Sequence, residues 1–327
     1  MSIKGIPEFG NPGVKPPRQP LKNIERALRS FALDQNPSHL TGLLVNIRTS
    51  LNLLKSVPQK QFRALLKNRA GTTALYDYFK KYTYIQFIAI GSEWPITSKG
   101  IDGNGAWGPR QAEGQVLGKN NQDQHAIYMT KAGEALLSGN YKMLHQSLCN
   151  ILRGINEPLA SPNLSRNKLE GALKDLLADK FLDNELEILY LSLALHDIGK
   201  ILKDKVDPRN GNIIDGKIQH RESGPYLAED MLQALGYDNK NIAVIKFLIR
   251  HHSDYWDLFC HKVYGKYNNN TTPESLETDL LEFFLSPQTV EKSKIKKMMA
   301  IISIADVHAS GDRYLSDAFI DFVAGNI

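Results

Sequence analysis

Apolar residues recur at intervals of three and four along most of the chain, which is the spacing of one face of an α-helix. The pattern predicts helices over residues 21–33, 40–54, 62–66, 126–137, 141–152, 169–177, 182–195, 223–235, 242–252, 276–285 and 295–304. Thr272-Pro273-Glu274 is typical of a helix start, with a hydroxyl cap, a proline in the first turn and a carboxylate near the positive end of the dipole. We therefore expect a mainly α fold.

Two stretches depart from this helical spacing. Residues 82–90 are rich in Tyr, Ile and Phe and lead into a segment rich in glycine, which predicts a short strand followed by a long loop. Residues 1–20 hold five of the 15 prolines and predict an irregular tail. The expected organisation is a tail over 1–20, a mostly helical accessory region over 21–123 and a helical domain over 124–327.

The composition is that of a globular protein. Of the 327 residues, 42% are hydrophobic and 23% are charged, which excludes a wholly disordered, collagen-like or coiled-coil chain. No apolar run approaches the roughly 20 residues that a membrane span requires, and the first residues lack the apolar core of a secretory signal. The two cysteines are too few for a disulfide framework and show no CxxC spacing. We expect a cytoplasmic protein without a membrane span.

Charge is distributed unevenly along the chain. Residues 1–100 hold 15 Lys and Arg against 5 Asp and Glu, whereas residues 101–327 hold 25 against 30. A basic surface of this kind can attract nucleic acid, headgroups or an acidic protein. No RNA-binding signature, zinc-finger spacing or glycine-rich phosphate loop accompanies it, so we expect a helical surface packed on the main domain rather than a nucleic-acid binder.

An apolar helix ends in a histidine and an aspartate. The stretch Leu191–Leu195 is followed by His196, Asp197, Ile198, Gly199 and Lys200. A carboxylate in apolar surroundings is costly unless it is paired, and a divalent cation compensates both it and a neighbouring imidazole. A hydrogen-bonded structural pair is the alternative. Gly199 suits a helix end or a close approach of two backbones.

Other ligand-type residues stand near the ends of separate predicted helices. They are His220, the pair His251 and His252, and Asp306. His145 lies inside another predicted helix, and His125 is its competitor as an upstream ligand. A helical bundle can direct side chains from several helices toward one interior point. The sequence therefore predicts a shared metal site.

This set resembles the HD superfamily of metal-dependent phosphohydrolases, which are helical proteins. The resemblance covers about residues 125–320 and rests on HDIGK at His196–Lys200, His220, the pair at 251–252 and the ending Ile304-Ala305-Asp306. The chain is also near the HD-GYP variant, which degrades cyclic dinucleotides. It departs from that variant because Ser253-Asp254-Tyr255 replaces the glutamate and Gly-Tyr-Pro loop, so cyclic-dinucleotide specificity is not expected.

The resemblance implies a dinuclear site. His145, His196, Asp197 and Asp306 would bind one divalent ion, and Asp197 would bridge to a second ion held by His220 and His251. Mn, Fe, Ni, Co and Zn all suit this ligand set. Adjacent helical residues point about 100° apart, so His251 and His252 are not expected to play the same part. We expect His251 to be the ligand and His252 to contact substrate.

The implied reaction is hydrolysis of a nucleotide or a related small phosphoester, as a phosphomonoesterase or a phosphodiesterase. The metals would lower the pKa of a bridging water and supply hydroxide. Lys200 would bind phosphate or protonate the leaving oxygen. Phosphate clamps are expected from Arg221, Arg250 and Arg313, and a base is expected to stack on Tyr255 or Trp256.

Two other functions use the same residues differently. Some HD-like proteins resemble di-iron oxygenases, which would be distinguished by a redox-active iron pair and by oxygen consumption. The third possibility is a scaffold whose basic region binds a partner. The presence of every candidate ligand favours a working site over a scaffold.

Overall fold

The computed structural model describes residues 36–51, 180–202, 205–214, 219–265, 271–310 and 317–326, most of 129–139, and isolated positions at 23–34 and 171. Several predicted features lie outside these residues: the tail, the strand at 82–90, His125, His145 and Arg313. The accessory region is described mainly by one helix.

The described part of the chain is helical, as predicted. Its elements are α2 (Ser38–Leu51), α9 (Asp183–Leu195), the 3₁₀ helix η3 (Ile198–Leu202), α10 (His220–Ala234), α11 (Asn239–Arg250), α12 (Asp254–Tyr264), α13 (Pro273–Phe283), α14 (Lys292–Ser310) and α15 (Asp317–Ala324). No strand occurs among these residues, where the nearest feature is an isolated antiparallel bridge between Val206 and Ile213. The mainly α fold is therefore confirmed.

The start of α13 follows the prediction closely. The Thr272 hydroxyl accepts a hydrogen bond from the backbone N–H of Ser275 at 3.1 Å, and Pro273 occupies the first turn. The helical spacing in the sequence predicted neither α12 nor α15.

Helix α9 forms the centre of the core. Ile188, Leu189, Leu191, Leu193 and Leu195 are each at most 1% exposed, and at 100° per residue they occupy more than half of the helix circumference. A helix with so wide an apolar surface must be covered by more than one neighbour. In agreement, α9 packs against both α11 and α14, while α10 packs against α11 and η3. No helix of the described residues is long and apolar enough to cross a membrane.

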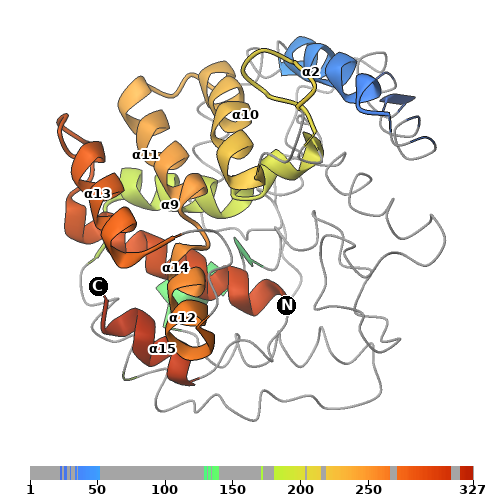
Figure 1. The fold of residues 1–327 in the computed structure, drawn as a ribbon. Coiled ribbons are helices and arrows are strands. Elements are labelled where there is room, and N and C mark those ends of the chain that lie inside the picture. Colours follow the sequence, from blue (N-terminus) through green and yellow to red (C-terminus); the bar gives the residue numbers. More distant parts are fainter. Residues whose placement is uncertain are drawn as a thin grey trace, which may run out of the picture.

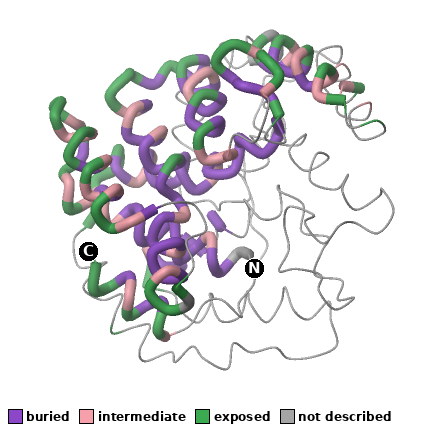
Figure 2. The backbone as a smooth tube through the Cα atoms, viewed as in Figure 1, coloured by how far each residue is buried: buried purple, intermediate pink, exposed green. Residues whose placement is uncertain are grey.

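Figure 1 shows α10 and α11 side by side on one side of α9, with α12, α14 and α15 on the other side. Buried backbone is concentrated where these helices meet, and the outer turns of α13 and α15 are exposed (Figure 2). Polar residues brought to this meeting point are therefore surrounded by apolar ones.

Helix α2 packs against α10, as expected for part of an accessory region. Leu40, Leu43, Leu44 and Ile47 are each at most 2% exposed. Arg48 donates from Nε to Asp230 and from Nη2 to the Pro208 carbonyl, both at 2.8 Å. The domain boundaries themselves remain a prediction.

Candidate metal centre

The end of α9 delivers His196 and Asp197 into the core. His196 caps the C-terminus of the helix and is 0% exposed, and Asp197 is 5% exposed. The chain then turns at once into η3, with the N–H of Lys200 donating to the Asp197 carbonyl at 3.0 Å. A charged carboxylate is thus held where the apolar helix stops.

Gly199 explains how α10 comes so close to this turn. A Cβ atom on residue 199 would lie 2.1 Å from the His220 carbonyl oxygen and 2.5 Å from Ser223 Oγ. Such distances are far below van der Waals contact, so the site requires a residue without a side chain. The expected close backbone approach is therefore confirmed, and it places His220, the first residue of α10, beside Asp197.

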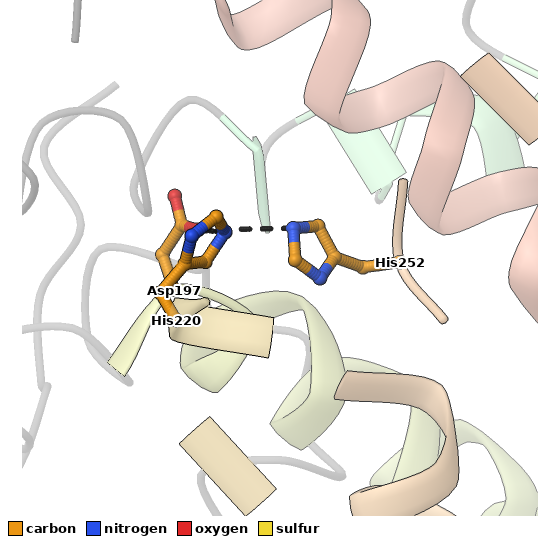
Figure 3. A group of neighbouring side chains, drawn as sticks. All are labelled: Asp197, His220 and His252. Atoms are coloured by element: carbon orange, nitrogen blue, oxygen red, sulfur yellow. Dashed lines mark ion pairs between the residues drawn. The ribbon is translucent and has the colours of Figure 1, made fainter. Parts of the chain in front are cut away.

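Three side chains from three separate segments meet at one point. Asp197 Oδ1 lies 3.2 Å from His220 Nε2 and 3.8 Å from His252 Nε2. One ligand atom from each of the three lies within 4.8 Å of the other two, and Figure 3 shows the His252 ring facing the other two side chains. His252 comes from the short link between α11 and α12.

The second oxygen of Asp197 faces a different pair. Asp197 Oδ2 lies 3.0 Å from His196 Nε2, which in turn lies 3.8 Å from Asp306 Oδ1 on α14. Asp197 therefore stands between two groups of ligand-type atoms, with one carboxylate oxygen directed toward each.

Backbone carbonyls orient two of the imidazoles. His252 Nδ1 lies 2.7 Å from the Ile249 carbonyl, and His196 Nδ1 lies 2.9 Å from the Leu193 carbonyl. A carbonyl accepts but does not donate, so in each ring Nδ1 carries the hydrogen. In the neutral ring Nε2 then presents a lone pair, the arrangement found in metal-binding histidines. Imidazole nitrogens and carboxylate oxygens are a donor set that suits divalent transition metals.

The electrostatics of the cluster keep two imidazoles neutral. Burial, together with the Lys200 charge, lowers the pKa of His220 to about 3, and burial also lowers the pKa of His252. Burial opposes ionisation of Asp197, yet the charges of His196 and Lys200 hold its pKa well below the usual range. The Asp197 carboxylate outweighs burial at His196 and raises the pKa of that ring.

Lys200 is the cation nearest to Asp197 among the described residues. Its Nζ lies 2.5 Å from Asp197 Oδ1, and its side chain is 9% exposed. The ammonium group thus sits on the same carboxylate oxygen that faces His220 and His252. A buried lysine in this position is suited to contact an anionic group that enters the site.

The structure places His252, rather than the expected ligand His251, beside Asp197. His252 faces Asp197, whereas His251 Nδ1 lies 2.6 Å from Asp254 Oδ2 and its Nε2 lies 3.9 Å from Asp279. Both histidines follow the end of α11, where successive side chains point to opposite sides. His252, and not His251, therefore lies in the group with Asp197 and His220 that could hold a metal ion.

The arginines are placed away from the cluster or are engaged elsewhere. Arg221 Nη1 donates to Asp254 Oδ1 at 3.0 Å and to Thr271 Oγ1 at 3.2 Å. Arg250 is exposed and, with His251, lines a groove of about 770 Å³ between α10, α11 and α13. Asp197, His220 and His252 do not line that groove, so its size does not make it the site of chemistry.

The two residues expected to stack on a base are packed against other parts of the protein. Tyr255 is 2% exposed, and its hydroxyl donates to the Asn326 carbonyl at 3.4 Å. The Trp256 ring packs on Phe259 and Phe319, with centroids 5.6 and 5.3 Å away. Both residues lie in the first turn of α12, and their rings anchor that helix to the C-terminal segment.

Sequence reasoning missed one residue that fixes the cluster. Ser303 on α14 is 1% exposed, and its hydroxyl donates to the His252 carbonyl at 2.7 Å. A serine between isoleucines in an apolar helix, three residues before Asp306, was the available signal.

Comparison with known protein families matches residues 168–284 to the HD domain. Comparisons with curated proteins and with solved structures give no match. The matched segment contains His196, Asp197, His220 and His252, and Asp306 lies beyond it. Residues 168–284 of this chain are thus matched as an HD domain, which supports its membership of the HD-domain superfamily.

Proposed function

We propose that the protein is a metal-dependent phosphoester hydrolase. The observation that carries the proposal is the meeting of Asp197, His220 and His252 within 4.8 Å inside an HD domain. HD-domain proteins are in general metal-dependent phosphohydrolases, and the donor atoms suit a divalent transition metal.

Two ions are proposed, shared by Asp197. His220 and His252 with Asp197 Oδ1 would hold one, and His196 and Asp306 with Asp197 Oδ2 would contribute to the other. His145 or His125 is proposed as a further ligand of the second ion. A bound divalent pair supplies charge neutralisation and acidifies water for attack on phosphorus.

The chain's own residues would orient and neutralise the substrate. The backbone carbonyls of Ile249 and Leu193 hold His252 and His196 with Nε2 inward, which fixes the ligand geometry before a substrate enters. Lys200 is proposed to bind a phosphoryl oxygen or to donate a proton to the leaving oxygen. Its contact with Asp197 supports this role, because the ammonium group lies beside the carboxylate that would hold the ions.

Nucleotides are the first substrates to test, and this choice rests on the HD-domain match rather than on a base-stacking pocket. Tyr255 lies in the core, and Trp256 packs against it. Simple phosphomonoesters and phosphodiesters belong in the same panel.

The proposal is tested on purified protein stripped with chelator and reloaded separately with Mn²⁺, Fe²⁺, Co²⁺, Ni²⁺ or Zn²⁺. Wild-type protein should bind metal and release phosphate or cleave a diester, and Asp197→Ala should lose bound metal and activity together. Asp207→Ala is the matched control, because Asp207 is also buried but is held by Arg209 in a separate loop. Full metal content and turnover in Asp197→Ala would refute the site, and oxygen-dependent turnover with iron would favour the oxygenase.

A further inference from the structure

A second set of polar residues lies on the outer side of the link between α11 and α12. Both oxygens of Asp254 are used: Oδ2 faces His251 Nδ1 at 2.6 Å, and Oδ1 accepts from Arg221 at 3.0 Å and from Thr271 Oγ1 at 3.3 Å. Asp254, His251 and Thr271 are at most 6% exposed. We call Arg221, His251, Asp254 and Thr271 the outer network.

Each end of the outer network is covalently adjacent to a proposed metal ligand. Arg221 follows His220 at the start of α10, and His251 precedes His252 at the end of α11. Asp254 is therefore the side chain that ties together the two backbone segments from which His220 and His252 project. The N–H of Asp254 also donates to the His251 carbonyl at 3.2 Å, which tightens the link.

We infer that the outer network positions His220 and His252 for metal binding, with Asp254 as its central residue. The inference rests on the proposed function, because it assigns these histidines as ligands. Metal ligation demands accurate placement of donor atoms, and groups that orient ligands typically change metal affinity 10–100-fold when removed. Without the Asp254 carboxylate, His251 Nδ1 loses its acceptor and Arg221 loses its nearest carboxylate, while the contacts of Arg221 with Thr271 and Asp257 stay.

The geometry favours positioning over general structural support. His252 is already fixed on its inner side by the Ile249 carbonyl and by the Ser303 hydroxyl, while His220 begins a helix whose N-cap, Gln219, makes no side-chain cap. The outer network supplies His220 with a side-chain tether through its neighbour. We therefore expect its loss to displace His220 more than His252.

The test compares Asp254→Asn with Asp257→Asn. The asparagine at 254 keeps the shape of the side chain but removes its charge, so the fold is expected to persist. Asp257 is an apt control because it lies on the same helix, is equally buried at 3% and lies farther from Arg221, at 3.6 Å; its carboxylate also accepts a hydrogen bond from Ser253 at 3.4 Å. A second pair of variants, Arg221→Ala and Arg221→Lys, tests whether a lysine at this position retains the metal affinity that the alanine variant is expected to lose.

Two readouts separate the inference from the proposed function. Titration with Mn²⁺ measures metal affinity, and imidazole NMR signals of His220 and His252 in EDTA measure ligand position without metal. Asp254→Asn should weaken Mn²⁺ binding about 10–100-fold and move both imidazole signals, that of His220 the more, whereas Asp257→Asn should do neither. Arg221→Lys should bind Mn²⁺ more tightly than Arg221→Ala.

Each contrary result has a distinct meaning. If wild-type protein binds no Mn²⁺ or other divalent ion, the proposed function fails, yet the NMR comparison still tests positioning. If the imidazole signals of Asp254→Asn match those of wild type, or if both asparagine variants lose affinity equally and in proportion to their stability, the positioning inference is overturned.

Discussion

Two histidines that are neighbours in the chain lie in opposite surroundings. His252 points inward, where its Nε2 meets the Asp197 carboxylate beside two other imidazoles. His251 points outward, where Asp254 binds its Nδ1 and the Phe247 ring lies 4.3 Å from its own ring. Both are at most 4% exposed, so burial does not distinguish them.

The partners of Nδ1 explain the difference. A backbone carbonyl at Nδ1 of His252 fixes the hydrogen there and leaves Nε2 for a metal. A carboxylate at Nδ1 of His251 forms an ion pair or a strong hydrogen bond, and Nε2 then faces the rim of the groove near Asp279. The same residue type thus suits a ligand on one side of the link and a structural tether on the other.

The largest expected effect comes from removing each histidine in turn. His252→Ala should weaken binding of Mn²⁺ by more than about 100-fold, because a ligand is lost, and abolish turnover. His251→Ala should weaken binding by only about 10-fold, because it loosens the support of the ligand. Isothermal titration of chelator-treated protein measures both. A larger loss in His251→Ala than in His252→Ala would reverse the assignment.

The sequence predicted that these residues cluster, but it did not predict which histidine of the pair faces Asp197. Ligand-type residues near the ends of apolar helices predicted the cluster of Asp197, His220 and one histidine of the pair. Which of His251 and His252 points inward depends on the angle at which α11 ends, and three residues link it to α12, a helix the periodicity did not reveal. His145 and Arg313 lie outside the described residues, so their predicted roles stay predictions.

A substitution at Gly199 tests whether the fold around Asp197 and His220 depends on the close approach of α10. Gly199→Ala should reduce the free energy of unfolding by about 3 kcal/mol, because its Cβ would overlap the His220 carbonyl and the backbone must move. Gly42→Ala is the matched control. A Cβ there meets no atom within 4 Å, and alanine should stabilise α2 by about 0.5–1 kcal/mol. Urea unfolding in EDTA measures both, and equal stabilities of Gly199→Ala and wild type would contradict the close approach.

The glycine shows what local sequence can and cannot predict. Its place after the His-Asp pair indicated a helix end or a close contact, and both are found. The contacting atoms belong to the first turn of α10, which lies far enough along the chain that no local pattern identifies it. The base-stacking role expected for Tyr255 and Trp256 meets a related limit. The sequence around an aromatic residue near a ligand does not indicate whether its ring faces a substrate or, as for Trp256, packs on α15.

Trp256 follows the histidine pair closely in the chain, but its ring belongs to the aromatic packing of α12. Trp256→Ala should lower the free energy of unfolding by about 2 kcal/mol, less than for a fully buried tryptophan, because the ring is only partly buried against Phe259 and Phe319. The Michaelis constant and the Mn²⁺ affinity should not change. A specific rise in the Michaelis constant for nucleotides would return the ring to substrate binding.

The last expected effect is the pH dependence that His220 imposes on the stability of the metal-free protein. Its pKa in the folded state is about 3, against an ordinary value of 6.5, so the folded state favours the neutral ring. The stability that this provides is complete above pH 6.5 and is lost as the pH falls toward 3, with a slope of at most about 1.4 kcal/mol per pH unit. His252, whose pKa is also lowered, acts in the same direction, whereas the raised pKa of His196 provides stability that is lost as the pH rises.

The contribution of His220 is measured by comparing wild type with His220→Gln in urea unfolding with EDTA present. The useful range is about pH 6.5 to 4.5, which lies below the ordinary pKa of histidine and above that of aspartate. The variant should lose stability less steeply over this range, because its side chain takes up no proton. Parallel curves for the two proteins would mean that His220 titrates normally, and therefore that its ring nitrogen is not held in the buried cluster beside Lys200 and Asp197.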